Sequence, residues 1–197
     1  PSLNFPQTFD NNSTRIFYQQ WSEIIKIHGA SKAYTLLKQQ NGVTNVSNSH
    51  FASHLFGELL YRHEGISGFY ICDNTNAFGC YHGFIASAIQ TQGESVIGEI
   101  DRACLSRFGT RDSGCRHGIG HGLVEYLGPQ QLTKALDLCS DIQSTHLLGC
   151  TQGVFMEYNF PAMTNPTVDS PPFRTLDKND PYDPCNTLNK ESQPSCF

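Results

Sequence analysis

Apolar residues recur at three- and four-residue intervals along most of the chain, the spacing that places them on one face of an α-helix. Strand-like alternation of apolar and polar residues is nearly absent. The helical pattern covers residues 13–28, 30–40, 48–63, 94–108 and 131–142. The sequence therefore predicts an all-α protein.

Three further segments begin alike, with glycine, cysteine, two variable residues and glycine, at 79–83, 114–118 and 149–153. Their cysteines lie 35 residues apart, and so do two cysteines in a second register, Cys104 and Cys139. A period of this length is typical of two-helix solenoid units. We expect helical-hairpin repeats, stapled by disulfides, in a solenoid-like or partly closed α/α array.

The chain has 8 cysteines, which are either reduced thiols of a cytosolic protein or disulfides of an exported one. Their spacing favours disulfides, because Cys104 and Cys139, toward the ends of predicted helices, are each followed eleven residues later by a cysteine at the start of the next helix. Each short loop closed in this way stabilises the fold by roughly 2–3 kcal/mol. We therefore expect a secreted, extracellular or periplasmic protein. The predicted pairs are Cys72–Cys80, Cys104–Cys115, Cys139–Cys150 and Cys185–Cys196.

The composition changes near residue 160, where a proline-rich stretch without helical periodicity begins. We expect an α-hairpin repeat domain over 1–160, followed over 161–197 by a proline-rich loop and a partial further repeat. The pair Cys185 and Cys196 is either the junction of another repeat or a degenerate cap.

Histidines occur in pairs at helical spacing. His50 and His54 are four residues apart on one predicted helix, and His117 and His121 are four apart on another. Such a pair stacks two imidazoles on one helical face at chelating distance. His82 occupies the position of His117 in the preceding repeat and is a fifth candidate. The five histidines predict a site for one or two divalent transition metals, zinc first, with copper or iron as alternatives.

The alternative is that these histidines only pack or cap helices. Three glycines beside them bear on the choice, because each costs roughly 0.5–1 kcal/mol relative to alanine within a helix. Gly118, Gly120 and Gly122 therefore indicate that a neighbouring helix or a ligand approaches that backbone closely.

Carboxylates accompany the paired histidines. Glu58 and Glu125 each follow a histidine pair by four residues, where they would complete a metal shell, orient an imidazole or face solvent. Glu157 follows the position equivalent to His121 in the third repeat helix. Glu125 and Glu157 are the candidate catalytic residues, and Glu157 would act as a general base on metal-bound water.

Net charge and hydropathy limit the classes of partner and of function that the sequence allows. The net charge is −5 and the 13 basic residues are scattered, so nucleic acid is not an expected partner. No apolar stretch is long enough to span a bilayer. We expect an exported metal-binding repeat protein, with hydrolase or oxidoreductase activity left open. The alternative is a non-catalytic extracellular protein-interaction module or a self-assembling structural repeat module. The partner is left as an unknown small molecule or protein, with self-association open.

Overall fold

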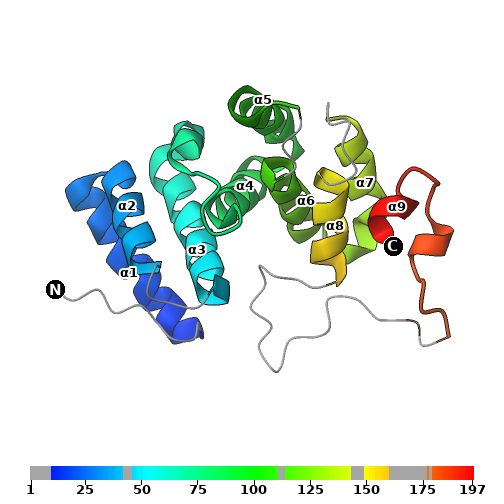
Figure 1. The fold of residues 1–197 in the computed structure, drawn as a ribbon, viewed down its shortest axis with the longest axis horizontal. Coiled ribbons are helices and arrows are strands. Elements are labelled where there is room, and N and C mark those ends of the chain that lie inside the picture. The colour runs from blue at the N-terminus through cyan, green and yellow to red at the C-terminus, as the bar shows by residue number, and fades with distance from the viewer. Residues whose placement is uncertain (1–9, 42–45, 111–113, 143–148, 160–176, 178) are drawn as a thin grey trace. The chain divides into compact units, whose positions relative to one another are not determined.

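The computed structural model describes residues 10–41, 46–110, 114–142, 149–159, 177 and 179–197. Every regular element in these ranges is an α-helix or a 3-10 helix, which confirms the all-α prediction (Figure 1). Contacts divide the chain into two compact units, residues 1–88 and 89–197, called here the first and second units. Most of the predicted proline-rich segment lies outside the described residues, so its loop structure stays a prediction.

In the first unit, the first three helices of the chain each pack against the other two, and the start of the fourth helix follows them (Figure 1). The aspartate at position 10 caps the first helix by accepting a 2.7 Å hydrogen bond from the Ser13 amide. Gly29, with φ of 79°, lets the chain turn directly into the next helix. The elements are α1 (Asn11–His28), α2 (Ala30–Asn41), α3 (Val46–Glu64), η1 (Gly65–Ile71) and α4 (Gly79–Gln92), which crosses the unit boundary.

Aromatic side chains join the first three helices. The ring of Phe56 from α3 stacks on Tyr34 of α2 with centroids 5.4 Å apart. It also meets Trp21 of α1 edge-on at 5.8 Å. All three residues are buried, so this cluster fixes α3 against the α1–α2 hairpin.

The second unit is built around α6 and α8, which make its most extensive helix–helix contact (Figure 1). Gly128, with φ of 82°, ends α6, and Pro129 begins the next element, as the sequence predicts. The elements are η2 (Gly93–Val96), α5 (Ile97–Phe108), α6 (Gly114–Leu127), η3 (Pro129–Gln131), α7 (Leu132–Ser140), α8 (Cys150–Asn159), η4 (Cys185–Thr187) and α9 (Gln193–Cys196).

All four predicted disulfides form, and no cysteine is free. Their Cα atoms lie between 5.5 and 5.7 Å apart, within the usual range for such bonds. The pairs are Cys72–Cys80, Cys104–Cys115, Cys139–Cys150 and Cys185–Cys196. Each staples an element to the start or the end of a neighbouring helix.

Glycines let α3 and α4 cross with their backbones in contact. A Cβ atom placed on Gly83 of α4 would overlap the carbonyl oxygen of His54 on α3. A Cβ on Gly57 of α3 would lie 2.7 Å from the amide nitrogen of Phe84. Any side chain at either glycine would push the two helices apart.

The α6–α8 crossing uses the same device. A Cβ on Gly120 would lie 2.5 Å from the amide nitrogen of Val154, and one on Gly153 would overlap the carbonyl oxygen of His117. The close approach predicted for Gly120 is therefore confirmed, and the neighbour is helix α8.

A buried ion pair ties α5 to α6. The Nε atom of Arg116 donates to Asp101 Oδ1 at 2.6 Å, and both side chains are almost fully buried. The two terminal nitrogens of Arg116 have no hydrogen-bond partner among the described residues. This pair links the two helices that Cys104 and Cys115 also join.

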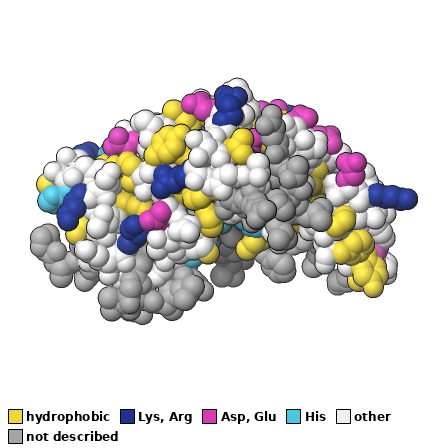
Figure 2. Space-filling view, turned by 45° about the horizontal axis from the view of Figure 1, so that its top comes forward, with side chains coloured by type: hydrophobic (Ala, Val, Ile, Leu, Met, Phe, Trp, Pro, Cys, Tyr) yellow, Lys and Arg dark blue, Asp and Glu magenta, His cyan; other side chains and the backbone are white. Residues whose placement is uncertain are grey.

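Acidic and basic side chains are interspersed over the face shown in Figure 2, without a continuous basic area among the described residues there. Nothing in this distribution points to a nucleic acid as partner. None of the described helices has the length and apolar character needed to cross a membrane.

Candidate metal centre

Three predicted ligands, His50, His54 and His82, converge in the first unit. We call them the three-histidine group. The Nε2 atoms of His50 and His54 are 2.9 Å apart, and His82 Nδ1 lies 3.2 Å from His54 Nε2. One ring nitrogen from each residue lies within 4.8 Å of the other two. The helical spacing on α3 and the crossing of α4 together produce this convergence.

The group is largely shielded from water. His54 and His82 are 2% and 6% exposed, whereas His50 is half-buried. The rings meet edge to face, with centroids 4.5 Å apart for His50 and His54 and 5.1 Å apart for His54 and His82. Access from solvent is therefore greatest at His50.

A turn between η1 and α4 fixes the orientation of His50. The Nδ1 atom of His50 lies 2.6 Å from the carbonyl oxygen of Asn76. Because a carbonyl can only accept, Nδ1 carries the hydrogen, and in the neutral ring the Nε2 lone pair faces the other imidazoles. Asn76, Ala77 and Phe78 have φ values of 53°, 51° and 61°, a left-handed conformation that is unusual for non-glycine residues.

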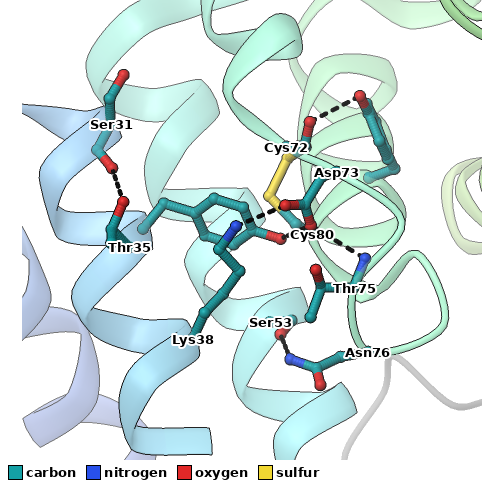
Figure 3. A network of polar contacts seen from close by, with 11 residues as sticks. Ser31, Thr35, Lys38, Ser53, Cys72, Asp73, Thr75, Asn76 and Cys80 are labelled. Carbon is teal, nitrogen blue, oxygen red and sulfur yellow. Dashed lines mark hydrogen bonds and ion pairs between the residues drawn. A yellow bond between two sulfur atoms is a disulfide. The ribbon is translucent and has the colours of Figure 1, made fainter.

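Polar contacts and a disulfide hold this turn in place (Figure 3). The Asn76 side chain donates to Ser53 Oγ at 2.9 Å, which ties the turn to α3. The disulfide Cys72–Cys80 closes the loop around it. The Tyr81 hydroxyl donates to the Cys72 carbonyl at 2.8 Å. The turn is thus fixed to both helices that carry the three-histidine group.

Asp73, at the start of the same loop, joins it to α2 (Figure 3). Its carboxylate accepts from Lys38 Nζ at 2.6 Å, from the Tyr34 hydroxyl at 2.9 Å and from the Thr75 amide at 3.0 Å. Burial is the largest influence on the pKa of Asp73 and raises it, but the hydrogen bonds from Lys38, Thr75 and Tyr34 together outweigh burial and lower that pKa to about 2. Burial, followed by the nearby Asp73 charge, raises the pKa of Tyr34.

Two of the predicted site residues meet in the second unit. His121 Nδ1 on α6 lies 2.8 Å from Glu157 Oε2 on α8, and both side chains are buried. The His117 ring lies 4.7 Å from the His121 ring at an interplanar angle of 67°. This matches the pair His50–His54, which has 4.5 Å and 65°.

The other predicted carboxylates differ in their surroundings. Glu58 Oε2 accepts from the Tyr18 hydroxyl at 2.6 Å and from Arg62 at 3.3 Å. Burial raises the pKa of Glu58, and the two donors oppose that shift. Glu58 therefore links α3 to α1, and its hydrogen-bond partners among the described residues are Tyr18 and Arg62 rather than an imidazole. Glu125 is half-buried, one turn beyond His121 on α6, and its catalytic role stays a prediction.

Comparisons with protein-family models, with curated proteins and with solved structures found no match to this chain. No family is therefore assigned.

Sequence reasoning missed the contribution of the turn at Asn76. The signal was present, because asparagine tolerates the left-handed conformation better than most residues and position 76 lies inside a loop closed by two cysteines. The contact between its carbonyl and His50 could not be predicted, since it depends on how α3 packs against that loop.

Proposed function

We propose that the protein is an exported metal-binding protein whose three-histidine group holds one divalent transition metal ion. The single observation that carries this proposal is the convergence of three ring nitrogens, from His50, His54 and His82, in a largely buried position. Neutral imidazoles suit zinc, copper(II) and iron(II), with zinc the first expectation because it is so often bound by three histidines.

The positions of the ring hydrogens support a cation between the three imidazoles. His50 Nε2 offers a lone pair, since its Nδ1 hydrogen is used by Asn76. The Nε2 atom of His54 lies 2.9 Å from His50 Nε2 and 3.2 Å from His82 Nδ1. A hydrogen on His54 Nε2 would face two neighbouring nitrogens at once, and without that hydrogen the lone pairs of His54 and His50 would face each other. A metal ion would instead accept one lone pair from each ring.

The spacing of the nitrogens supports the same conclusion. Zinc–nitrogen bonds of roughly 2.0–2.1 Å in a tetrahedron separate neighbouring ligand nitrogens by about 3.3–3.4 Å. The two separations between Nε2 of His54 and its neighbours, 2.9 and 3.2 Å, are slightly below this value. Small ring movements would bring the nitrogens to ligand distance, so binding needs little reorganisation of the helices.

Three protein ligands leave a coordination position for water or substrate, which is the arrangement of catalytic rather than structural zinc sites. The greater exposure of His50 supplies a side from which such a molecule could enter. This supports a metal-dependent hydrolase or oxidoreductase as the finer proposal. The substrate would be a small molecule or protein of unspecified chemistry. Glu125 and Glu157 belong to the second unit, so they stay candidate catalytic residues from the sequence and have no role at the three-histidine group in this proposal.

The proposal also includes export of the protein and a repeated helical-hairpin design. Four disulfides without a free cysteine fit an oxidising compartment, which supports secretion or a periplasmic location. Two glycine-mediated helix crossings, α3–α4 and α6–α8, support a repeated helical-hairpin design. In both, a histidine carbonyl meets the glycine of a Gly-Cys-x-x-Gly segment.

The test is elemental analysis of untagged protein purified without chelators. We expect the wild type to retain a transition metal, and His54→Ala to bind one equivalent less than the wild type. His63→Ala is the matched control, because His63 is exposed on the same helix and bonds Ser22. Absence of bound metal, repeated after incubation with zinc, copper and iron salts, would reject the proposal and favour a non-catalytic interaction module.

A further inference from the structure

We propose that Asn12, in the first turn of α1, is an acceptor for N-linked glycosylation. Asn12, Ser13 and Thr14 form an Asn-x-Thr sequence, the signal for N-glycosylation in a eukaryotic secretory pathway. The inference rests on the export that forms part of the proposed function. It adds a covalent modification on α1 to a unit whose three-histidine group lies on α3 and α4.

The reaction needs the amide nitrogen of Asn12 and a lipid-linked sugar donor. The Nδ2 atom attacks the anomeric carbon of an oligosaccharide that is carried on a lipid pyrophosphate. A carbon–nitrogen bond forms as the bond from that carbon to the pyrophosphate oxygen breaks, Nδ2 gives up one proton, and the lipid pyrophosphate leaves. No oxidant or reductant takes part, so the donor lipid is the one co-reactant.

The Asn12 side chain points away from the core of the first unit. Asn12 is exposed, whereas Phe17, Trp21 and Ile25 of the same helix are buried. Nine residues separate Asn12 from Trp21, which is about two and a half turns of an α-helix, so the two side chains leave α1 on opposite sides. A glycan on Asn12 is therefore compatible with the buried face of α1.

The hydrogen bond that Asn12 accepts in the fold is compatible with a glycan. Arg15 donates from Nη2 to Asn12 Oδ1 at 2.9 Å. Glycosylation uses Nδ2 and leaves the amide oxygen as an acceptor, so the modified residue keeps this bond. Arg15 would then hold the amide to which the sugar is attached.

Thr14 determines when the signal can be read. Its hydroxyl oxygen is buried and has no hydrogen-bond partner among the described residues. Side chains two residues apart on a helix do not face each other, so a transferase cannot contact Asn12 and Thr14 together once α1 has packed. Transfer would take place earlier, on the extended chain. Burial of an unpaired hydroxyl is unfavourable, and its recognition by the transferase gives it a use that the fold does not.

A second sequence of the same kind overlaps the first. Asn11, Asn12 and Ser13 form Asn-x-Ser, and Asn11 is also exposed. Around the helix Asn11 lies about 80° from Trp21, whereas Asn12 lies about 180° from it. Asn12 is thus the more outward of the two, and the bulk of one glycan excludes another on the adjacent residue. A third such sequence begins at Asn45, outside the described residues.

A glycan on Asn12 would cover apolar surface of α1. Ile16 follows Asn12 by one helical turn and is 46% exposed. Ile27 is 71% exposed and lies on the same side of α1, about three turns further along. N-linked glycans are bulky and solubilising, so the modification would shield the nearer isoleucine from other molecules.

The test is site-resolved mass spectrometry on the full chain, expressed behind a cleavable signal peptide in a eukaryotic secretory cell. Cell lysate and medium are both analysed, after removal of glycans by an enzyme that converts each modified asparagine to aspartate. We expect Asn12 to be modified in most molecules of the wild type, of Asn11→Gln and of Thr14→Ser, and to be unmodified in Thr14→Val. Valine keeps the shape of threonine and removes only a hydroxyl that is unpaired in the fold, so loss of the glycan in this variant does not reflect misfolding.

An unmodified Asn12 in the wild type, in lysate and medium alike, would overturn the proposal, and so would a glycan on Asn11 in its place or one retained at Asn12 in Thr14→Val. Elemental analysis of the same protein reports on the three-histidine group separately. A chain that is modified at Asn12 but binds no metal, or that is not released into the medium, would count against the proposed function and leave this site standing.

Discussion

The carbonyl oxygen of His54 occupies the place that a Cβ atom on Gly83 would take, so that no side chain fits between the two helices at this point. The next residue back along α4 is His82, whose Nδ1 atom lies 3.2 Å from the His54 ring. One backbone contact thus sets both the crossing of α3 with α4 and the distance between two predicted ligands.

Gly83→Ala is expected to damage stability and metal binding together. The added Cβ overlaps a backbone oxygen, so α4 must move away from α3, at a cost of about 1–3 kcal/mol in the free energy of unfolding. His82 moves with α4, and zinc affinity should fall at least 10-fold. Urea unfolding and competition with a zinc chelator measure the two effects.

Gly98→Ala is the matched control for that substitution. Gly98 lies on α5, where an added Cβ would meet only the flexible end of Arg102, at 3.7 Å. Alanine should stabilise this helix by about 0.5–1 kcal/mol and leave metal affinity unchanged. A comparable loss in both variants would show that the α3–α4 contact is not the cause.

Removing the disulfide Cys72–Cys80 is expected to weaken metal binding through the turn at Asn76. Cys72→Ser with Cys80→Ser frees the loop whose carbonyl orients His50, and stability should fall by roughly 2–3 kcal/mol. We expect zinc affinity to fall about 10-fold, measured by calorimetry under conditions where both proteins are folded. Removal of Cys185–Cys196, a disulfide of the second unit, should leave this affinity unchanged.

Acid should weaken the network around Asp73. Its pKa is lowered from 3.8 to about 2 in the folded protein, so the ionised carboxylate stabilises the fold above pH 3.8, and this contribution is lost as the pH falls from about 4 to 2. Because Asp73 is partly exposed to solvent, screening limits this contribution to the free energy of unfolding to roughly 1 kcal/mol. The stability difference between wild type and Asp73→Asn should therefore be present at pH 6 and vanish near pH 2. A difference that is independent of pH would contradict this account.

Removing one partner of the buried ion pair Arg116–Asp101 should destabilise the fold strongly, whereas replacing both partners by apolar residues should destabilise it much less. Asp101→Ala leaves the Arg116 guanidinium buried without a carboxylate, at an expected cost of about 3–5 kcal/mol. Arg116→Met combined with Asp101→Leu removes both charges and should recover most of that loss. Thermal unfolding of the single and double variants, analysed as a double-mutant cycle, gives the coupling energy.

Helix positions and disulfides could be predicted because both depend on local spacing. The apolar periodicity gave the helices of the first unit to within two residues, and the eleven-residue separations gave the pairing of Cys104 with Cys115. The i, i+4 spacing gave the partnership of His50 with His54 for the same reason.

Contacts that depend on how the helices pack could not be predicted from the sequence. Glu58 follows its histidine pair just as Glu125 does, yet it bonds Tyr18 of α1, because the side of α3 that it occupies faces the N-terminal hairpin. The glycines of α6 indicated a close neighbour, but the sequence alone did not identify α8 or place Glu157 against His121. Those relationships require the helix crossing angles, which periodicity does not contain.

His50 and His54 precede the loop closed by Cys72 and Cys80, and His82 follows it. In the unfolded chain these ligands therefore lie apart, and they meet only when α4 packs onto α3. Under the proposed export, the ion would be taken from the compartment in which the chain folds rather than from the one in which it is made. Local supply at that destination, more than the intrinsic order of affinities, would then select the element that the protein carries.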